Sequence, residues 1–328
     1  MNTLFFNTRS NWRLQPFVFL ICAILFIHNP PVIAQGRPAI AFTIKEKDLM
    51  PEGITYDSNT NSFFIGSLYK HKILRITTAG KINEFIRPDA FGLGQVVGMK
   101  VFGPANELWV CSNIPGKQSF IHVFDVLSGK LVRKFTVNGK KHFFNDLYIT
   151  TKGDVYITDS ASGGIYRISR GKESAEVYIP SGTFAYPNGI TSTQDGKNII
   201  VATGSEKGLV SIDLATKNQT PLSCRYLIYG VDGLYHYKNT LIGIQNSTFP
   251  ESVQQFVLSG DGKKITSVKM LAGPSSSFNI PTTGVIVGNN FYFIANTQLD
   301  QFTENDNKVH QRSTLKNVLI MRVFVPDL

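Results

Sequence analysis

Four oxygen-bearing side chains in this sequence lie at the same place in a recurring pattern. They are Glu52, Asn145, Asn188 and Asp232, and each is followed by Gly or Asp and then by a hydrophobic segment. Ca²⁺ takes about six to eight oxygen ligands and accepts carboxylate, amide and water oxygens together. Two carboxylates offset the double charge of the ion, while the amides add none. The residue types therefore indicate a divalent metal site with coordination positions left open for water or a substrate.

The same residue pairs also have an ordinary structural interpretation. Asn-Gly and Asp-Gly are common turns of β-hairpins, and Pro187-Asn188-Gly189 taken alone would be assigned as one. For any single pair we favour the turn. The equivalence of the four positions within a repeat favours metal binding instead, and the sequence contains no His or Cys set with the spacing of a zinc site.

The pattern that carries these residues recurs six times, every 43 to 51 residues, which is a period typical of propeller blades. Each start leads through a polar turn into a strongly apolar strand. We therefore predict an all-β fold, a six-bladed β-propeller with a central channel, over residues 35–328 as one domain, with a β-sandwich as the alternative. The units begin at Glu52, Val97, Asn145, Asn188, Asp232 and Thr283.

A propeller would bring the four polar residues together. The innermost strand of each blade lines the channel, so equivalent positions of the units face the axis. Glu52 and Asp232 would then meet although they lie in distant parts of the sequence. Converging carboxylates repel each other unless a cation lies between them. We expect the ring to close by pairing of residues 39–44 with the last strand, residues 318–325.

The N-terminal segment does not fit the repeat. An apolar run of about eleven residues, Phe17 to Ile27, follows two arginines, and Val32-Ile33-Ala34 matches a signal peptidase site with cleavage before Gln35. We predict a secretory signal peptide over residues 1–34 and an exported protein, periplasmic or secreted. An uncleaved anchor is the alternative, but a spanning helix needs roughly 20 apolar residues.

The composition excludes some partners. The chain has 328 residues, 42% of them hydrophobic, and a net charge of +10. No dense Lys/Arg block with interleaved aromatic residues occurs, so nucleic acid is not an expected partner. Cys111 and Cys224 could form a disulfide in an oxidising compartment, but nothing in their spacing demands one, and we expect free, buried thiols.

Short motifs around the four residues resemble those of the senescence marker protein (regucalcin)/gluconolactonase family. More distantly, they are similar to those of diisopropyl fluorophosphatase and the paraoxonases. The resemblance covers the chain after the signal and implies a six-bladed propeller that holds a divalent metal, usually Ca²⁺, and hydrolyses lactones or phosphoesters. The motifs are Pro51-Glu52-Gly53, Phe144-Asn145-Asp146, Pro187-Asn188-Gly189-Ile190 followed by Gln194-Asp195-Gly196-Lys197, and Val231-Asp232-Gly233.

The resemblance also implies roles for individual residues. Glu52, Asn188 and Asp232 match the metal ligands of the family. Asn145 matches an asparagine that contacts the substrate and in some relatives also the metal. Asp232 matches the aspartate assigned as catalytic base or nucleophile.

One departure from the family pattern bears on the substrate. Many members carry an arginine two residues before the substrate asparagine, where this chain has Phe143. A sugar lactone is therefore disfavoured. Phe143 and Phe144 suit a more hydrophobic lactone or ester, unless they pack in the core. His142 is a candidate auxiliary proton carrier, although a lone histidine beside a strand is more often a surface or packed residue.

The expected function is that of an exported, metal-dependent hydrolase. Ca²⁺ would polarise the carbonyl of a lactone, Asp232 would activate water or attack directly, and Asn145 would orient the substrate. The partner would be a small-molecule lactone or ester, with no nucleic acid and no membrane span after signal cleavage. The alternatives are a non-catalytic ligand-binding propeller with a structural ion and a strictosidine-synthase-like propeller that need not use a metal.

Overall fold

The computed structural model describes residues 37–137, 139 and 142–328. The predicted signal peptide, residues 1–34, lies outside these ranges. None of the described segments is a helix long and apolar enough to cross a membrane. The regular structure of the described residues is β, apart from four 3₁₀ turns, which are η1 (Ala90–Gly92), η2 (Gly103–Ala105), η3 (Leu299–Gln301) and η4 (Arg312–Thr314).

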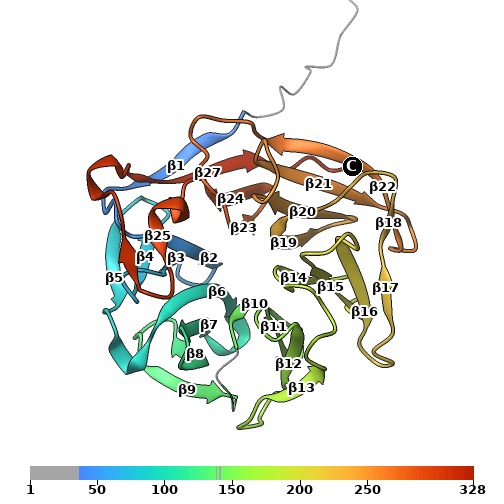
Figure 1. Cartoon of the computed structure of the whole chain (residues 1–328), viewed down its shortest axis with the longest axis horizontal. Helices are drawn as coiled ribbons and strands as arrows, with labels where there is room; N and C mark the ends of the chain where they lie inside the picture. Colours follow the sequence, from blue (N-terminus) through green and yellow to red (C-terminus); the bar gives the residue numbers. More distant parts are fainter. Residues whose placement is uncertain (1–36, 138, 140–141) are drawn as a thin grey trace, which may run out of the picture. The chain divides into compact units, whose positions relative to one another are not determined.

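Six sheets surround a central axis, which confirms the predicted six-bladed β-propeller (Figure 1). Each of the first five blades is a meander whose first strand lies nearest the axis. From the inside outward, blade 1 consists of β2 (Pro51–Asp57), β3 (Ser62–Ser67), β4 (Ile73–Thr77) and β5 (Ile82–Ile86), and blade 2 of β6 (Gln95–Phe102), β7 (Glu107–Ile114), β8 (Gln118–Asp125) and β9 (Leu131–Thr136). Blade 3 consists of β10 (Phe144–Ile149), β11 (Val155–Asp159), β12 (Gly164–Ile168) and β13 (Glu176–Ile179), and blade 4 of β14 (Ile190–Ser192), β15 (Asn198–Ala202), β16 (Leu209–Asp213) and β17 (Gln219–Pro221). Blade 5 consists of β19 (Val231–Tyr237), β20 (Thr240–Gln245), β21 (Ser252–Leu258) and β22 (Lys264–Ala272), with β18 (Ser223–Cys224) parallel to β22.

The sixth blade joins the two ends of the described chain. It consists of β23 (Gly284–Val287), β24 (Asn290–Ile294), β27 (Val318–Phe324) and β1 (Ala39–Ile44). β1 pairs antiparallel with β27, with Ile44 opposite Val318 and Ala39 opposite Arg322. The predicted closure of the ring is therefore confirmed.

The inner strands of blades 1, 2, 3 and 5 are irregular where the repeat begins. Glu52, Asn145 and Asp232 lie inside strands at these irregularities, and Asn188 lies two residues before β14. Their assignment as hairpin turns is therefore wrong. A bulge re-aims a side chain out of the normal alternation of a strand, and here it directs the first residue of the repeat to the channel. The register shifts lie between Pro51 and Ile54, Val96 and Met99, Phe144 and Leu147, and Val231 and Leu234.

Glycine follows the first residue of most repeats because neighbouring inner strands touch there. A Cβ atom on Gly53 would overlap the carbonyl oxygen of Val97, and one on Gly189 would overlap that of Asp232. The backbone nitrogen of Gly189 donates to the same Asp232 oxygen at 3.0 Å. The repeated glycine therefore permits close packing of adjacent blades.

Hydrophobic side chains fill the spaces between blades. Phe63 and Ile65 of the first blade, for example, pack with Ile294 and Ile320 of the sixth. Within the described residues both expected free thiols are found, with Cys111 buried as predicted but Cys224 only half-buried.

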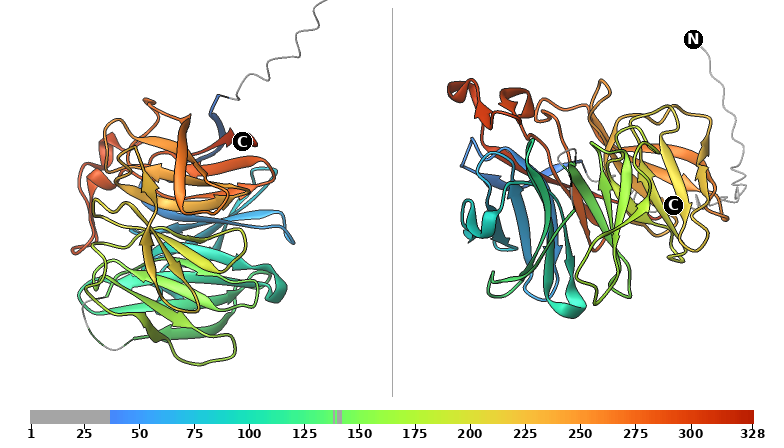
Figure 2. Two further views of the ribbon diagram at one scale, coloured as in Figure 1. Left: turned by 90° about the vertical axis from the view of Figure 1, so that its right-hand side faces the viewer. Right: turned by 60° about the horizontal axis from the view of Figure 1, so that its bottom comes forward.

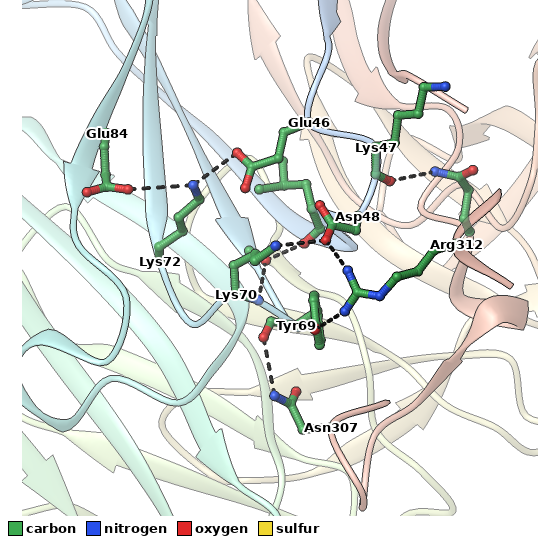
Figure 3. Close-up of polar contacts among 12 residues, drawn as sticks. Glu46, Lys47, Asp48, Tyr69, Lys70, Lys72, Glu84, Asn307 and Arg312 are labelled. Carbon is green, nitrogen blue, oxygen red and sulfur yellow. Dashed lines mark hydrogen bonds and ion pairs between the residues drawn. The ribbon is translucent and has the colours of Figure 1, made fainter. Parts of the chain in front are cut away.

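The chain between β24 and β27 leaves the sixth blade and crosses to the first two. This blade 6 excursion, residues 295–317, carries η3, β25 (Phe302–Thr303), β26 (Lys308–Val309) and η4, and it projects from one face of the ring (Figure 2). Arg312 Nη1 donates to Asp48 Oδ2 at 2.7 Å, and Asn307 Nδ2 donates to the carbonyl oxygen of Tyr69 at 3.3 Å (Figure 3). The excursion is thus fastened to the first blade.

The glycine contact between blades 4 and 5 yields a stability prediction. Gly189→Ala should lower the free energy of unfolding by about 1–3 kcal/mol, because the new methyl group overpacks the Asp232 carbonyl. Urea unfolding followed by circular dichroism measures the change. The matched control is Gly260→Ala, whose Cβ would meet nothing within 4 Å. Equal stability of the two variants would contradict the packing role of Gly189.

Candidate functional site

The four sequence-predicted residues line one pocket at the end of the channel. Glu52, Asn145, Asn188 and Asp232 come from blades 1, 3, 4 and 5, and the pocket has a volume of about 180 Å³. Its remaining lining residues are Leu68, Phe143, Tyr186, Asn246, Ser247, Leu299 and Glu304. The ring therefore brings together groups that are distant in sequence.

The two carboxylates of this set are buried and differently bonded. Glu52 and Asp232 are each only 7% exposed. Asp232 Oδ2 accepts a hydrogen bond from Asn246 Nδ2 at 2.5 Å. Glu52 Oε2, in contrast, is buried and has no hydrogen-bond partner among the described residues. A buried carboxylate oxygen without a donor is costly, so this atom is available to a bound ligand.

The amide of Asn145 is held in a fixed orientation. Asn145 Nδ2 donates to Ser160 Oγ at 2.9 Å, and Ser160 Oγ donates to the carbonyl oxygen of Pro187 at 2.7 Å. Because its side-chain nitrogen is bound in this way, the side-chain oxygen of Asn145 is available to a ligand. Asn188, the residue after Pro187, lines the same pocket as Asp232.

Burial and mutual repulsion disfavour charge on the carboxylates. Burial, and then the negative charges of Asp232, Glu304 and Asp146, raise the pKa of Glu52 well above its usual range. Burial likewise raises the pKa of Asp232 to about 7, although hydrogen bonds from Asn246 and Asn188 act in the opposite direction. A cation placed between the two groups would displace their protons, since metal ligation requires the deprotonated form.

These donors fit a hard divalent cation. Oxygen ligands of mixed carboxylate and amide type suit Ca²⁺, and Glu52, Asn188 and Asp232 would hold it, with Asn145 beside them. Among residues 37–137, 139 and 142–328, no three His, Cys, Asp or Glu side chains form a metal site by themselves. The set therefore depends on its amides, and its two acids match the double charge of the ion.

The aromatic residues before Asn145 are divided between the pocket and the core. Phe143 lines the pocket, whereas Phe144 is buried in the hydrophobic core. Phe143 also packs against this core from its half-buried position. Core packing is therefore confirmed for Phe144, and a substrate contact of Phe143 stays a prediction. His142 is not a lining residue of this pocket; its Nδ1 lies 2.6 Å from Asp159 Oδ2, and its ring packs against Tyr166. A proton-carrier role for His142 stays a prediction.

Four polar pocket residues, Asn246, Ser247, Tyr186 and Glu304, were not predicted from the sequence. Asn246 directly follows the second strand of its blade, just as Ser160 follows β11 in the third blade. A search for polar residues after the second strand of each repeat would have found it. Tyr186 and Glu304 lie in a loop and in the blade 6 excursion, where the repeat gives no signal.

Comparison with known proteins supports the fold. No protein-family model matches the chain, and no curated protein sequence matches it. Among solved structures, a gluconolactonase from Xanthomonas campestris is 12% identical with a TM-score of 0.60, over 87% of this chain and 88% of that one. A calcium-binding protein, regucalcin, from Agrobacterium tumefaciens is 15% identical with a TM-score of 0.61, over 87% and 94%. The resemblance to the gluconolactonase and regucalcin fold is therefore confirmed.

The same architecture also serves other chemistry. A PQQ-bound aldose sugar dehydrogenase from Streptomyces coelicolor is 11% identical with a TM-score of 0.59, over 88% of this chain and 98% of that one. Likeness at such identities establishes the fold, and the activity must be argued from the residues of the site.

We predict that the pocket with Glu52 and Asp232 binds a single Ca²⁺ ion. Titration of chelator-treated protein with Ca²⁺, followed by calorimetry, should show one binding event. Glu52→Gln should weaken it about a hundredfold or more, because one of two ligand charges is lost. The exposed Glu206, which does not line the pocket, provides the control Glu206→Gln, which should bind as the parent does. Unchanged affinity in Glu52→Gln would remove Glu52 from the site.

Proposed function

We propose that this protein is a metal-dependent hydrolase that opens a lactone at the channel mouth. The observation that carries the proposal is the unpartnered Oε2 of Glu52, in a pocket where Asp232 and the amides of Asn145 and Asn188 complete an oxygen donor set. When bound, Ca²⁺ would balance the two carboxylates and polarise the carbonyl of the ester.

The groups of the chain would act on water and on the substrate. Asp232 is oriented by Asn246, and it would take a proton from the attacking water or attack the acyl carbon itself. Asn145, fixed by Ser160, would orient the substrate. Hydrolysis adds one water across the acyl C–O bond: the ring oxygen leaves as a hydroxyl group, and the new carboxylic acid releases one proton on ionisation.

The pocket favours a small substrate with an apolar body. Leu68, Phe143 and Leu299 line it beside the polar groups, and such side chains exclude water from the reacting bond. Its volume of about 180 Å³ lies below the roughly 300–1,000 Å³ of sites for drug-sized ligands. A short-chain hydrophobic lactone therefore suits the site better than a sugar lactone.

We also propose that the protein works outside the cytoplasm. The support is the sequence of residues 1–34, with its apolar run and its small residues before Gln35. N-terminal sequencing of the protein from the exported fraction should begin at Gln35.

A pH-stat assay of aliphatic, aromatic and sugar lactones tests the activity. Turnover should require Ca²⁺ and stop in chelator. Asp232→Asn should lower kcat by about 10²–10⁴-fold, because a general base or nucleophile is lost. The matched control is Asp195→Asn, which changes an exposed aspartate of a surface turn and should keep full activity.

The outcomes separate the candidate functions. A folded, Ca²⁺-loaded protein without turnover on any lactone, phosphoester or related ester would be a ligand-binding scaffold. Turnover that persists in chelator, or in Asp232→Asn, would contradict the mechanism proposed above.

A further inference from the structure

The blade 6 excursion places a third carboxylate at the pocket. The carbonyl oxygen of Glu304 accepts a hydrogen bond from Gln95 Nε2 at 2.7 Å, which ties this residue to the inner strand of blade 2. Glu304 lines the pocket beside Glu52 and Asp232. Glu304 is exposed, and within the described part of the chain its carboxylate forms no hydrogen bond or ion pair. No three acidic residues of the pocket form a metal site by themselves among the described residues. It is therefore available to a bound molecule.

The charge balance of the pocket is incomplete without such a molecule. The cation proposed above would offset Glu52 and Asp232, so Glu304 would leave one uncompensated negative charge at the mouth. A neutral ligand would leave this charge unpaired, whereas a ligand with one positive charge would compensate it.

Tyr186 adds an aromatic ring to the lining of the same pocket. This residue lines the pocket, is 55% exposed and has a left-handed backbone conformation with φ of 46°. Such a conformation is uncommon for a bulky residue and marks strain of the kind kept at functional sites. The face of a tyrosine ring attracts ammonium groups. A carboxylate and an aromatic ring together are thus suited to an organic cation.

We propose that Glu304 and Tyr186 make this site selective for a lactone whose ring carries a positively charged amine. This inference rests on the lactonase function proposed above. The amine would lie at the mouth of the pocket, between Glu304 and Tyr186. The apolar ring would pack against Phe143 and Leu299, and the ester group would lie beside Glu52, Asn188 and Asp232. Glu304 is then a specificity-determining residue that takes no part in the chemical step.

A matched pair of substrates tests the proposal. One is a γ-butyrolactone with an aminomethyl substituent, and the other carries an ethyl group of the same shape. The wild-type protein should prefer the amine about tenfold or more in kcat/KM, as expected for a charge-assisted hydrogen bond. Glu304→Gln should abolish the preference, measured as the ratio of kcat/KM for the amino lactone to kcat/KM for the ethyl lactone. Tyr186→Leu should reduce the preference for the amine about threefold.

The control lies on the same excursion. Asp300→Asn removes an equal charge from an exposed residue that does not line the pocket, and it should keep the preference. An unchanged preference in Glu304→Gln, or none in the wild type, would overturn the proposal. So would a large loss of Ca²⁺ affinity in Glu304→Gln, which would make this residue a metal ligand.

A binding measurement separates this proposal from the proposed activity. The corresponding aminomethyl and ethyl lactams resist hydrolysis, and their dissociation constants can be measured by calorimetry on the Ca²⁺-loaded protein. A preference for the amino lactam that depends on Glu304 would support the cation site even if no lactone is turned over. Equal binding of the two lactams would overturn it, whether or not lactones are hydrolysed.

Discussion

The close approach of neighbouring inner strands is the constraint on which the rest of the structure depends. Around the axis six strands must fit into little space, and a side chain at Gly53 or Gly189 would collide with the backbone of the next blade. The strands meet at these points, and in the first blade a bulge lies beside Gly53. The residues before these two glycines, Glu52 and Asn188, line a common pocket, so one packing requirement both joins the blades and brings these side chains together.

The same geometry also brings two buried carboxyl groups into one pocket, which is electrostatically unfavourable. It buries Glu52 and Asp232 in one small pocket and leaves Glu52 Oε2 without a donor. A fold optimised only for stability would place apolar side chains there, as it does at the equivalent Val97 of the second blade. Buried like charges without compensation persist where a ligand supplies the missing charge. The cation that we propose for this site would supply the missing charge.

How far the sequence predicts this arrangement depends on the repeat. The period gives the blade number, the closure by residues 39–44 and the convergence of Asp232 with Glu52, because equivalent positions share one geometry. It does not distinguish Phe143 from Phe144, since a bulge at this point breaks the alternation that would assign their faces. The repeat does not predict Glu304 as a pocket residue, because the blade 6 excursion that carries it belongs to no repeat. Its position is set by tertiary contacts of the excursion with Gln95 and with the first blade.

The pairing of β1 with β27 has a consequence for the order of folding. These strands lie at opposite ends of the described residues, so their contact spans a large sequence separation and carries a high loop-closure entropy. The first five meanders are local and can form as the chain emerges, whereas the ring cannot shut until its last residues are present. The pocket, which draws on residues from Glu52 to Glu304, is complete only at that final event. A ligand that binds the pocket would therefore stabilise the closed form of the ring relative to any opened form.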